Sequence, residues 1–310
     1  MIKKIDDKLK NYPCDLCGRR NEEYLYNKQG VLSTFLFRVV RCRSCGLIYI
    51  NPRLAEEAIK DLYDGDYYDG EGFDTYVNYI SDYEKEKDID KIFRTEQKVK
   101  IIKELVHPPA ALLDFGCGLG DFVRQAVKYG YDAEGFEVSK YSVRFVRSRG
   151  FKVYDSLQDI PHNKYDIVTA IEVLEHCSSP MEVLSKIYYC LKPGGTFYYT
   201  TENFDWFYEK WKLGIKDVLD GYIVPEGHIH FFSTHVMEMY FSKIGYSDVF
   251  CFEPRTYIKH GRLFRRLNKI GLTDSSDIPE SILTKLSYYG LRKVITTIGL
   301  RRKTLPIARR

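Results

Sequence analysis

The stretch LLDFGCGLGDF, residues 112–122, constrains the fold of this chain more than any other. Its apolar start predicts a buried strand, and its end returns to helical spacing. Three glycines alternate in the turn between them: Gly116, Gly118 and Gly120. Glycines let a backbone approach a ligand closely, and a helix N-terminus offers unpaired N–H groups. The stretch therefore predicts strand, turn and helix, with a ligand site at the turn.

An acidic residue follows the next predicted strand. That strand covers residues 131–136, and Glu137 comes directly after it. A carboxylate in this place can accept two hydrogen bonds from ribose hydroxyls. Asp114 and Asp121 flank the glycine turn, and acids suit a cationic ligand better than a pyrophosphate because like charges repel. Alone, G-x-G-x-G is equally typical of an ordinary tight turn, but with Glu137 it predicts a site for a nucleoside-bearing cofactor.

Two later stretches extend this pattern. Residues 165–176 (YDIVTAIEVLEH) predict a strand leading into a helix, and residues 191–198 (LKPGGTFY) predict a turn and another strand. From about residue 96 to 252 these motifs resemble, in order, the class I S-adenosylmethionine-dependent methyltransferases. The E-V-L-E-H run at residues 172–176 is especially similar to the ubiquinone-biosynthesis O-methyltransferases. The resemblance implies S-adenosylmethionine as the cofactor.

The resemblance also implies which residues bind that cofactor. The first two glycines of the turn would line the methionine end, and Glu137 would hold the ribose. The pair Ala170-Ile171 would lie under the sulfonium, and the acid that meets the adenine amine falls near Asp155 or Ser156. The implied cofactor-binding residues are Asp114, Gly116, Cys117, Gly118, Gly120, Glu137, Asp155, Ala170 and Ile171.

Alternating strands and helices predict the fold class. We expect an α/β, Rossmann-like, mainly parallel seven-stranded sheet with helices on both faces, over residues 96–258. An insertion at residues 202–225 carries both tryptophans, Trp206 and Trp211. It emerges at the carboxyl ends of the strands, where ligands bind in open α/β sheets. We interpret the insertion as a lid or substrate wall, with a dimer contact as the alternative.

Four of the eight cysteines form two C-x-x-C-G motifs near the N-terminus. They are Cys14, Cys17, Cys42 and Cys45. Each turn places two sulfurs on one side, and the glycine lets backbone N–H groups point at the thiolates. Two such turns supply the four-sulfur shell that Zn²⁺ prefers, so residues 1–50 predict a ribbon with structural zinc, with a redox pair as the alternative. The other cysteines are predicted to be buried thiols.

A lead-in at residues 51–95 joins the ribbon to the sheet. We expect a short helix over residues 54–63 and then a loop rich in Asp, Gly and Tyr at residues 64–74. Together with the ribbon, the lead-in resembles the N-terminal part of bacterial methyltransferases from surface-sugar and natural-product pathways. Its tyrosines either cover the cofactor or substrate, or pack as an ordinary loop on the core.

The chain ends in a basic segment, residues 259–310, which we predict to be helical. Seven Lys or Arg and no acid follow Leu291. A membrane-surface or nucleic-acid patch and a solvated tail both fit this pattern. The charged N-terminus and the lack of a long apolar run predict a cytoplasmic protein. Nothing in the sequence indicates an oligomeric state.

Three histidines are candidates for a general base, because histidine titrates near neutrality. In order of preference they are His228, His230 and His176. The first two lie in PEGHIHFFS, residues 225–233, which resembles the E-H-x-x-Y-F region of zinc-ribbon sugar C-methyltransferases except for an extra glycine. For each of the three, a structural histidine is the alternative.

The E-x-x-E-H run has a second interpretation. Glu172, Glu175 and His176 share a helical face and could hold a divalent ion. The resemblance to quinone O-methyltransferases suggests the same use. Packing at a helix start, next to the cofactor, is the interpretation that we favour.

The predicted function is methyl transfer to a small-molecule acceptor. A hydroxyl of a sugar or sugar nucleotide, in a surface-polysaccharide or natural-product pathway, is the leading acceptor. One alternative is an RNA methyltransferase that uses the ribbon and basic tail, with binding that weakens steeply as salt rises. Another is a non-catalytic S-adenosylmethionine-binding subunit that activates a partner.

Overall fold

A computed structural model describes residues 8–63, 65–68, 89–213, 223–247, 251–252 and 294–302. Most of the basic tail, part of the lead-in and residues 214–222 of the insertion lie outside this range. The side chains of both tryptophans in the insertion lie outside it as well. The lid therefore stays a prediction. Within the described ranges, no helix is long and apolar enough to cross a membrane.

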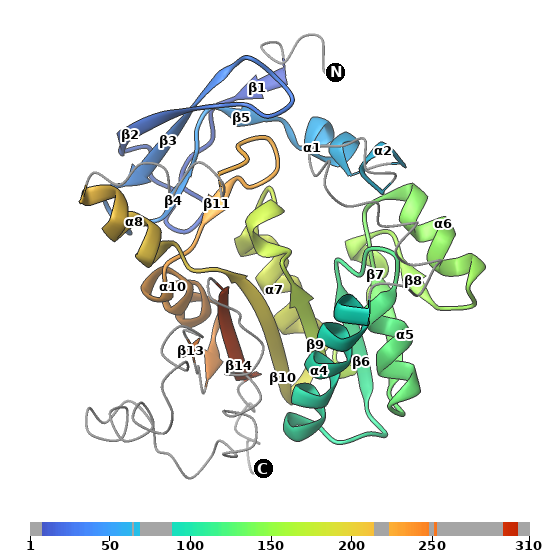
Figure 1. The fold of residues 1–310 in the computed structure, drawn as a ribbon. Coiled ribbons are helices and arrows are strands. Elements are labelled where there is room, and N and C mark those ends of the chain that lie inside the picture. The colour runs from blue at the N-terminus through green and yellow to red at the C-terminus, as the bar shows by residue number, and fades with distance from the viewer. Residues whose placement is uncertain are drawn as a thin grey trace.

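A central sheet of five parallel strands confirms the predicted fold class (Figure 1). In spatial order the strands are β10 (Leu191–Glu202), β9 (Tyr165–Ile171), β6 (Ala111–Phe115), β7 (Asp132–Phe136) and β8 (Val153–Tyr154). The helices α4 (Ile89–Leu105), α5 (Asp121–Lys128) and α6 (Lys140–Ser148) pack on one face. On the other face lie α7 (Pro180–Cys190) and α10 (Thr234–Ile244).

Successive strand residues explain the two layers. In β6, Leu112 packs in the cluster with α4, α5 and α6, whereas Leu113 packs in the cluster with α7 and α10. Serine residues begin three of the helices, because each side chain accepts a hydrogen bond from a backbone N–H one turn later. These N-caps are Ser139, Ser179 and Ser233.

The predicted helical tail is wrong for residues 294–302. They form strand β14 (Val294–Arg302), which lies antiparallel between β10 and the short strands β12 (Tyr246–Ser247) and β13 (Cys251–Phe252). Five consecutive Val, Ile and Thr residues begin β14, and β-branched residues favour strands. The central sheet thus extends beyond the predicted boundary at residue 258. This sheet has eight strands where seven were predicted, because the short strands β12 and β13 both pair with the same side of β14.

The N-terminal ribbon is a four-stranded antiparallel sheet. Its strands are β2 (Glu22–Gln29), β3 (Leu36–Cys42), β4 (Ile48–Ile50) and β11 (His230–Phe231). The fourth strand, β11, follows β10 in the sequence and pairs with β4 (Figure 1). A two-stranded sheet of β1 (Leu9–Lys10) and β5 (Arg53–Leu54) extends the ribbon past residue 50. The ribbon sheet therefore includes one strand from a segment that follows the central parallel strands in the sequence.

The lead-in contains the predicted short helix, α1 (Glu56–Leu62). Residues 65–68, predicted as loop, instead form one helical turn, α2 (Gly65–Tyr68). The described part of the insertion forms α8 (Phe204–Lys212). It packs on the ribbon, because the rings of Phe204 and Phe231 lie 5.0 Å apart and Arg41 lies over the Tyr208 ring.

Candidate active site

The glycine turn connects β6 to α5 in left-handed backbone conformations. The φ angles of Gly116, Gly118 and Gly120 are 73°, 53° and 81°. A Cβ on Gly116 would lie 2.6 Å from Val173 Cγ2, so the turn packs directly against the segment after β9. A Cβ on Gly118 would meet nothing within 4 Å. The middle of the turn therefore leaves open space beside the backbone, as a bound ligand requires.

Glu137 lies at the end of β7 and fixes this turn. Its carboxylate accepts hydrogen bonds from the N–H groups of Gly118 (2.9 Å), Val138 (2.8 Å) and Ser139 (3.0 Å). Burial raises the pKa of the Glu137 carboxyl, while these three bonds act in the opposite direction. The arrangement joins the ends of β6 and β7 through one acidic group, where the ribose is expected.

The remaining predicted cofactor residues differ in their surroundings. Asp114 is buried and accepts from the Thr169 hydroxyl at 2.6 Å, and burial raises its pKa to about 7. The Cys117 thiol is buried, which raises its pKa, and it packs against Gly135. Asp155 is half exposed and pairs with Arg147 at 3.2 Å. Its carboxylate therefore already has a partner, and its role at the adenine stays a prediction.

The predicted floor lies where β9 ends. Ala170 is fully buried, and Ile171 follows it. Glu172 comes next with a φ of 54°, a conformation that costs a non-glycine residue energy and often marks functional sites. Its N–H donates to Thr200 O at 2.9 Å. The Glu172 carboxylate has no hydrogen bond or ion pair with the residues that the structure describes.

Tyrosines of the lead-in cover this end of the sheet. Tyr68 is buried and stacks on Tyr141 of α6 at 5.8 Å, in a cluster with Leu119 of the glycine turn. The rings of Tyr63 and Tyr67 make a T-shaped contact, with their centres 5.2 Å apart. The lead-in thus packs on the glycine turn and reaches the histidines of the predicted acceptor end.

His176 is the histidine best placed to accept a hydrogen bond from a bound acceptor. Its Nδ1 lies 2.6 Å from Tyr63 Oη and 3.1 Å from Gly227 O, and Tyr63 Oη lies 3.4 Å from the same carbonyl. A proton on Nδ1 satisfies all three contacts, because the carbonyl can only accept. Nε2 then carries the lone pair, and it has no partner among the described residues. Burial and the nearby His228 lower the pKa of His176 to about 3, so the ring is neutral.

The other two histidines have different surroundings. The His228 ring contacts the His176 ring at 4.6 Å, so the predicted segment and the E-V-L-E-H run meet here. His230 is buried in β11, where Nδ1 lies 3.1 Å from Cys177 O and Nε2 lies 3.2 Å from Arg53 NH1. Arginine only donates, so Nε2 accepts and Nδ1 carries the proton. Both ring nitrogens of His230 therefore have partners, as expected if this histidine has a structural role.

The alternative divalent-ion site is not formed. Glu175 is buried and accepts from the Thr201 hydroxyl at 2.8 Å, and burial raises its pKa. Within the described residues, one group of His, Cys, Asp or Glu side chains converges as metal ligands would. That group consists of Cys14, Cys17, Cys42 and Cys45, whose sulfurs all lie within 4.8 Å of one another.

The four sulfurs fit a tetrahedral zinc shell. The Sγ atoms of Cys14 and Cys45 are 3.4 Å apart, and those of Cys17 and Cys42 are 3.5 Å apart. Zn–S bonds of about 2.3 Å imply sulfur separations of about 3.8 Å, close to these distances. Gly18 and Gly46 follow the two motifs with φ angles of 75° and 79°. Their N–H groups donate to the carbonyls of Cys14 and Cys42, which closes both turns.

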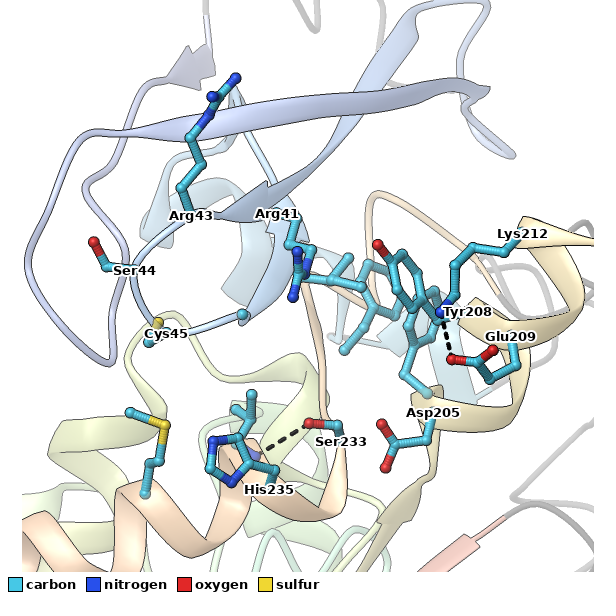
Figure 2. Close-up of a pocket in the computed structure, with 16 residues that line it drawn as sticks. Arg41, Arg43, Ser44, Cys45, Asp205, Tyr208, Glu209, Lys212, Ser233 and His235 are labelled. Atoms are coloured by element: carbon cyan, nitrogen blue, oxygen red, sulfur yellow. Dashed lines mark hydrogen bonds and ion pairs between the residues drawn. The ribbon is translucent and has the colours of Figure 1, made fainter.

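A separate pocket of about 500 Å³ lies between the ribbon, α8 and the start of α10 (Figure 2). Arg41 points toward Tyr208 and lies 5.5 Å from the centre of its ring, whereas Arg43 points away (Figure 2). Asp205 receives the Thr234 N–H at 3.1 Å and so helps to cap α10. Neither the glycine turn nor the three candidate histidines line this pocket.

Two interactions at the predicted acceptor end had only a weak signal in the sequence. Tyr63 belongs to the tyrosine-rich lead-in, but its contact with His176 joins residues far apart in the chain. Arg53 belongs to the N-P-R start of the lead-in, but its contact with His230 likewise joins residues far apart in the chain. The four cysteines, by contrast, were identified by their spacing alone.

Known proteins are similar to this chain in sequence and fold. A family model described as a methyltransferase domain matches residues 79–249. The ubiquinone biosynthesis O-methyltransferase of Aliivibrio fischeri is 28% identical over 102 residues, 30% of this chain and 44% of that protein. The enzyme of the same name from Methylococcus capsulatus is 32% identical over 101 residues, 29% of this chain and 43% of its own length. The chain thus spans less than half the length of these relatives.

A solved structure supports the fold. The plantazolicin methyltransferase BamL, in complex with a triazolic desmethylPZN analog and SAH, superposes with a TM-score of 0.51 at 11% identity. The match covers 80% of this chain and 97% of that one. At this identity the likeness concerns the fold alone. Because the family model covers more than half of its residues, the chain belongs to this family of methyltransferase domains.

Proposed function

We propose that this protein transfers the methyl group of S-adenosylmethionine to a hydroxyl of a small-molecule acceptor. The observation that carries the proposal is the Nε2 of neutral His176, which has no partner among the described residues, in a ring held by Tyr63 and the Gly227 carbonyl. His176 follows β9 by a few residues, so it lies close in the chain to the predicted cofactor floor at Ala170-Ile171. Base and methyl donor would therefore meet at the carboxyl end of one strand.

The chain's residues supply binding, orientation and a hydrogen-bond acceptor. The open space at Gly118 would suit the methionine end of the cofactor and the carboxylate of Glu137 its ribose, and the cofactor supplies an electrophilic methyl group. Lead-in tyrosines cover the site and keep water from the sulfonium. His176 Nε2 would accept a hydrogen bond from the acceptor's O–H and so turn an oxygen lone pair toward the methyl group. As the oxygen is methylated, the O–H proton would pass to Nε2 and on to solvent, because burial lowers the pKa of this ring to about 3. Such a positioned base typically adds a factor of roughly 10² to 10⁴.

We assign structural zinc to the four cysteines. All four positions of the tetrahedron are filled by protein, so the ion would hold the ribbon together and take no part in methyl transfer. The deep burial of Cys14 and Cys42 agrees with such a closed site.

A sugar or sugar-nucleotide hydroxyl is the acceptor class that we propose first. It rests on the resemblance of the ribbon, lead-in and PEGHIHFFS segment to sugar methyltransferases. The relatives reported above are named for ubiquinone biosynthesis, so acceptors of that pathway form the comparison set. A neutral, buried histidine suits either kind of hydroxyl.

Two measurements test the proposal. Calorimetric titration should give S-adenosylmethionine binding that Glu137→Ala abolishes. With an acceptor found by screening, His176→Gln should lower kcat by roughly 10² to 10⁴ while cofactor affinity stays the same. His162→Gln is the matched control, because His162 is exposed and its ring stacks on Tyr189, away from His176 and the glycine turn. Unchanged turnover in His176→Gln would show that the base is misassigned.

A further inference from the structure

The segment that follows His176 is tied to the ribbon at nearly every residue. Cys177 O accepts from His230 Nδ1 at 3.1 Å, and Ser178 O accepts from Arg53 NH2 at 2.6 Å. Ser179 Oγ donates to Asp15 Oδ1 at 2.7 Å, and the Met181 N–H donates to Asp15 Oδ2 at 2.9 Å. Four successive anchors thus fix the chain between the predicted base and the first turn of α7.

Asp15 makes two of these anchors from within the metal-binding turn. It lies between Cys14 and Cys17, so the ligands on either side set the place of its carboxylate. A third donor, Tyr240 Oη of α10, reaches it at 2.8 Å. A carboxylate at a helix N-terminus accepts hydrogen bonds from free N–H groups and interacts favourably with the helix dipole. Asp15 therefore caps α7 from another part of the chain.

Arg53 makes the next anchor at the base of the ribbon. Its side chain is 5% exposed and stacks on the Tyr12 ring, with Cζ 4.4 Å from the ring centre. One guanidinium nitrogen donates to Ser178 O, and another donates to His230. Such contacts hold a buried guanidinium in one orientation. The position of residues 177–178 therefore depends on that of the ribbon.

The ribbon also holds the segment on the other side of His176. Glu226 is fully buried and accepts the N–H groups of Val31 and Leu32 in the β2–β3 turn, each at 3.1 Å. Three residues later, Ile229 donates to Glu175 O and accepts from the Ile50 N–H. Gly227, whose carbonyl orients His176, lies between these two fixed points.

We propose that the zinc ribbon positions the catalytic histidine, with Asp15 as its principal positioning residue. This inference rests on the proposed function, because it takes His176 as the base. The metal-binding turn fixes the position of Asp15. Asp15 and Arg53 fix the positions of residues 177–181, and these residues determine the direction of His176 Nε2. A misplacement of about 1 Å at a reacting group can lower the rate by roughly 10²-fold. The ribbon is thus part of the acceptor site.

The test compares the wild-type chain with Asp15→Asn, Asp15→Ala and Arg43→Gln. Arg43 is the control, because it lies in the second metal-binding turn and its exposed side chain makes no hydrogen bond or ion pair within the described part of the chain. Hydrogen–deuterium exchange of residues 174–184, cofactor affinity, kcat and KM are measured for each. We expect Asp15→Ala to speed exchange in this segment and lower kcat roughly 10- to 100-fold, with cofactor affinity within about twofold. Asp15→Asn, which keeps one acceptor oxygen, should lie between.

Two outcomes overturn the inference. One is exchange at residues 174–184 that stays as in the wild type in both Asp15 variants. The other is a loss of thermal stability with kcat per cofactor-binding site unchanged, which would mean a merely structural role. If Asp15→Ala does not fold, Asp15→Asn and removal of metal from the wild type by a chelator give the same exchange readout. Failure of the proposed function would appear separately, as normal turnover in His176→Gln.

Discussion

The Asp114→Asn substitution should stabilise the folded protein at both pH 8 and pH 5, and about twice as much at pH 8. Asp114 is 3% exposed, and its hydrogen-bond partner among the described residues is the Thr169 hydroxyl. Burial raises the pKa of its carboxyl from 3.8 to about 7, although the Thr169 hydrogen bond and the charge of Lys98 act in the opposite direction. Asparagine keeps the shape and the oxygen that accepts from Thr169, but it carries no charge.

The magnitude follows from linkage between protonation and folding. An acid with a raised pKa keeps, in the folded state, a proton that the unfolded chain has released. Stability therefore falls as the pH rises from about 4 to about 7 and is level above that. At 1.36 kcal/mol per pKa unit, the difference between 3.8 and about 7 costs the wild type roughly 4 kcal/mol at pH 8. At pH 5 the cost is about 2 kcal/mol or less.

Urea unfolding at the two pH values measures this effect. The stability advantage of Asp114→Asn over the wild type should be roughly 2 to 3 kcal/mol larger at pH 8 than at pH 5. Asp132→Asn, an exposed aspartate at the start of β7, controls for unspecific effects of losing one charge. The same advantage at both pH values would refute the reasoning. The stabilised variant should also bind the cationic cofactor more weakly, because it lacks a nearby negative charge.

Three further changes test other parts of the structure. Cys14→Ser should lower bound zinc, measured by mass spectrometry, together with the melting temperature, whereas Cys190→Ser, at a buried thiol away from the cluster, should keep the zinc. Tyr63→Phe should lower kcat roughly tenfold in steady-state kinetics with cofactor affinity unchanged, because His176 loses one of two contacts at Nδ1. Gly116→Ala should cost roughly 1 to 3 kcal/mol of stability in urea, since its Cβ would meet Val173. Gly150→Ala has a similar φ but meets no atom within 4 Å, so it should lose less.

The sequence indicated the central sheet and the cofactor turn because their signals are local. A glycine turn, an acid after the next strand and a C-x-x-C spacing are each contained within a few residues. Strand β14 was predicted as helix because its apolar residues also fit a helical period. Its place beside β10 is set by pairing with a strand about a hundred residues away, which no local pattern records.

The acceptor end was predicted less well for the same reason. All three candidate histidines do lie near one another, but their roles depend on partners from the ribbon and lead-in. Arg53 and Cys177 contact both ring nitrogens of His230, and Tyr63 with Gly227 orients His176. Each of these contacts joins segments more than fifty residues apart in the chain. Residue type alone could not rank the three.

The pairing of β11 with β4 has a consequence for synthesis on the ribosome. Strand β4 emerges early, whereas His230 and Phe231 emerge only after most of the catalytic sheet. Until then the edge of β4 presents unpaired N–H and C=O groups, which readily pair with other chains. Metal capture by the four nearby thiols can fold the nascent ribbon early, but its sheet closes only when the catalytic region is nearly complete. The pairing of β4 with β11 is therefore a late step in the synthesis of the chain.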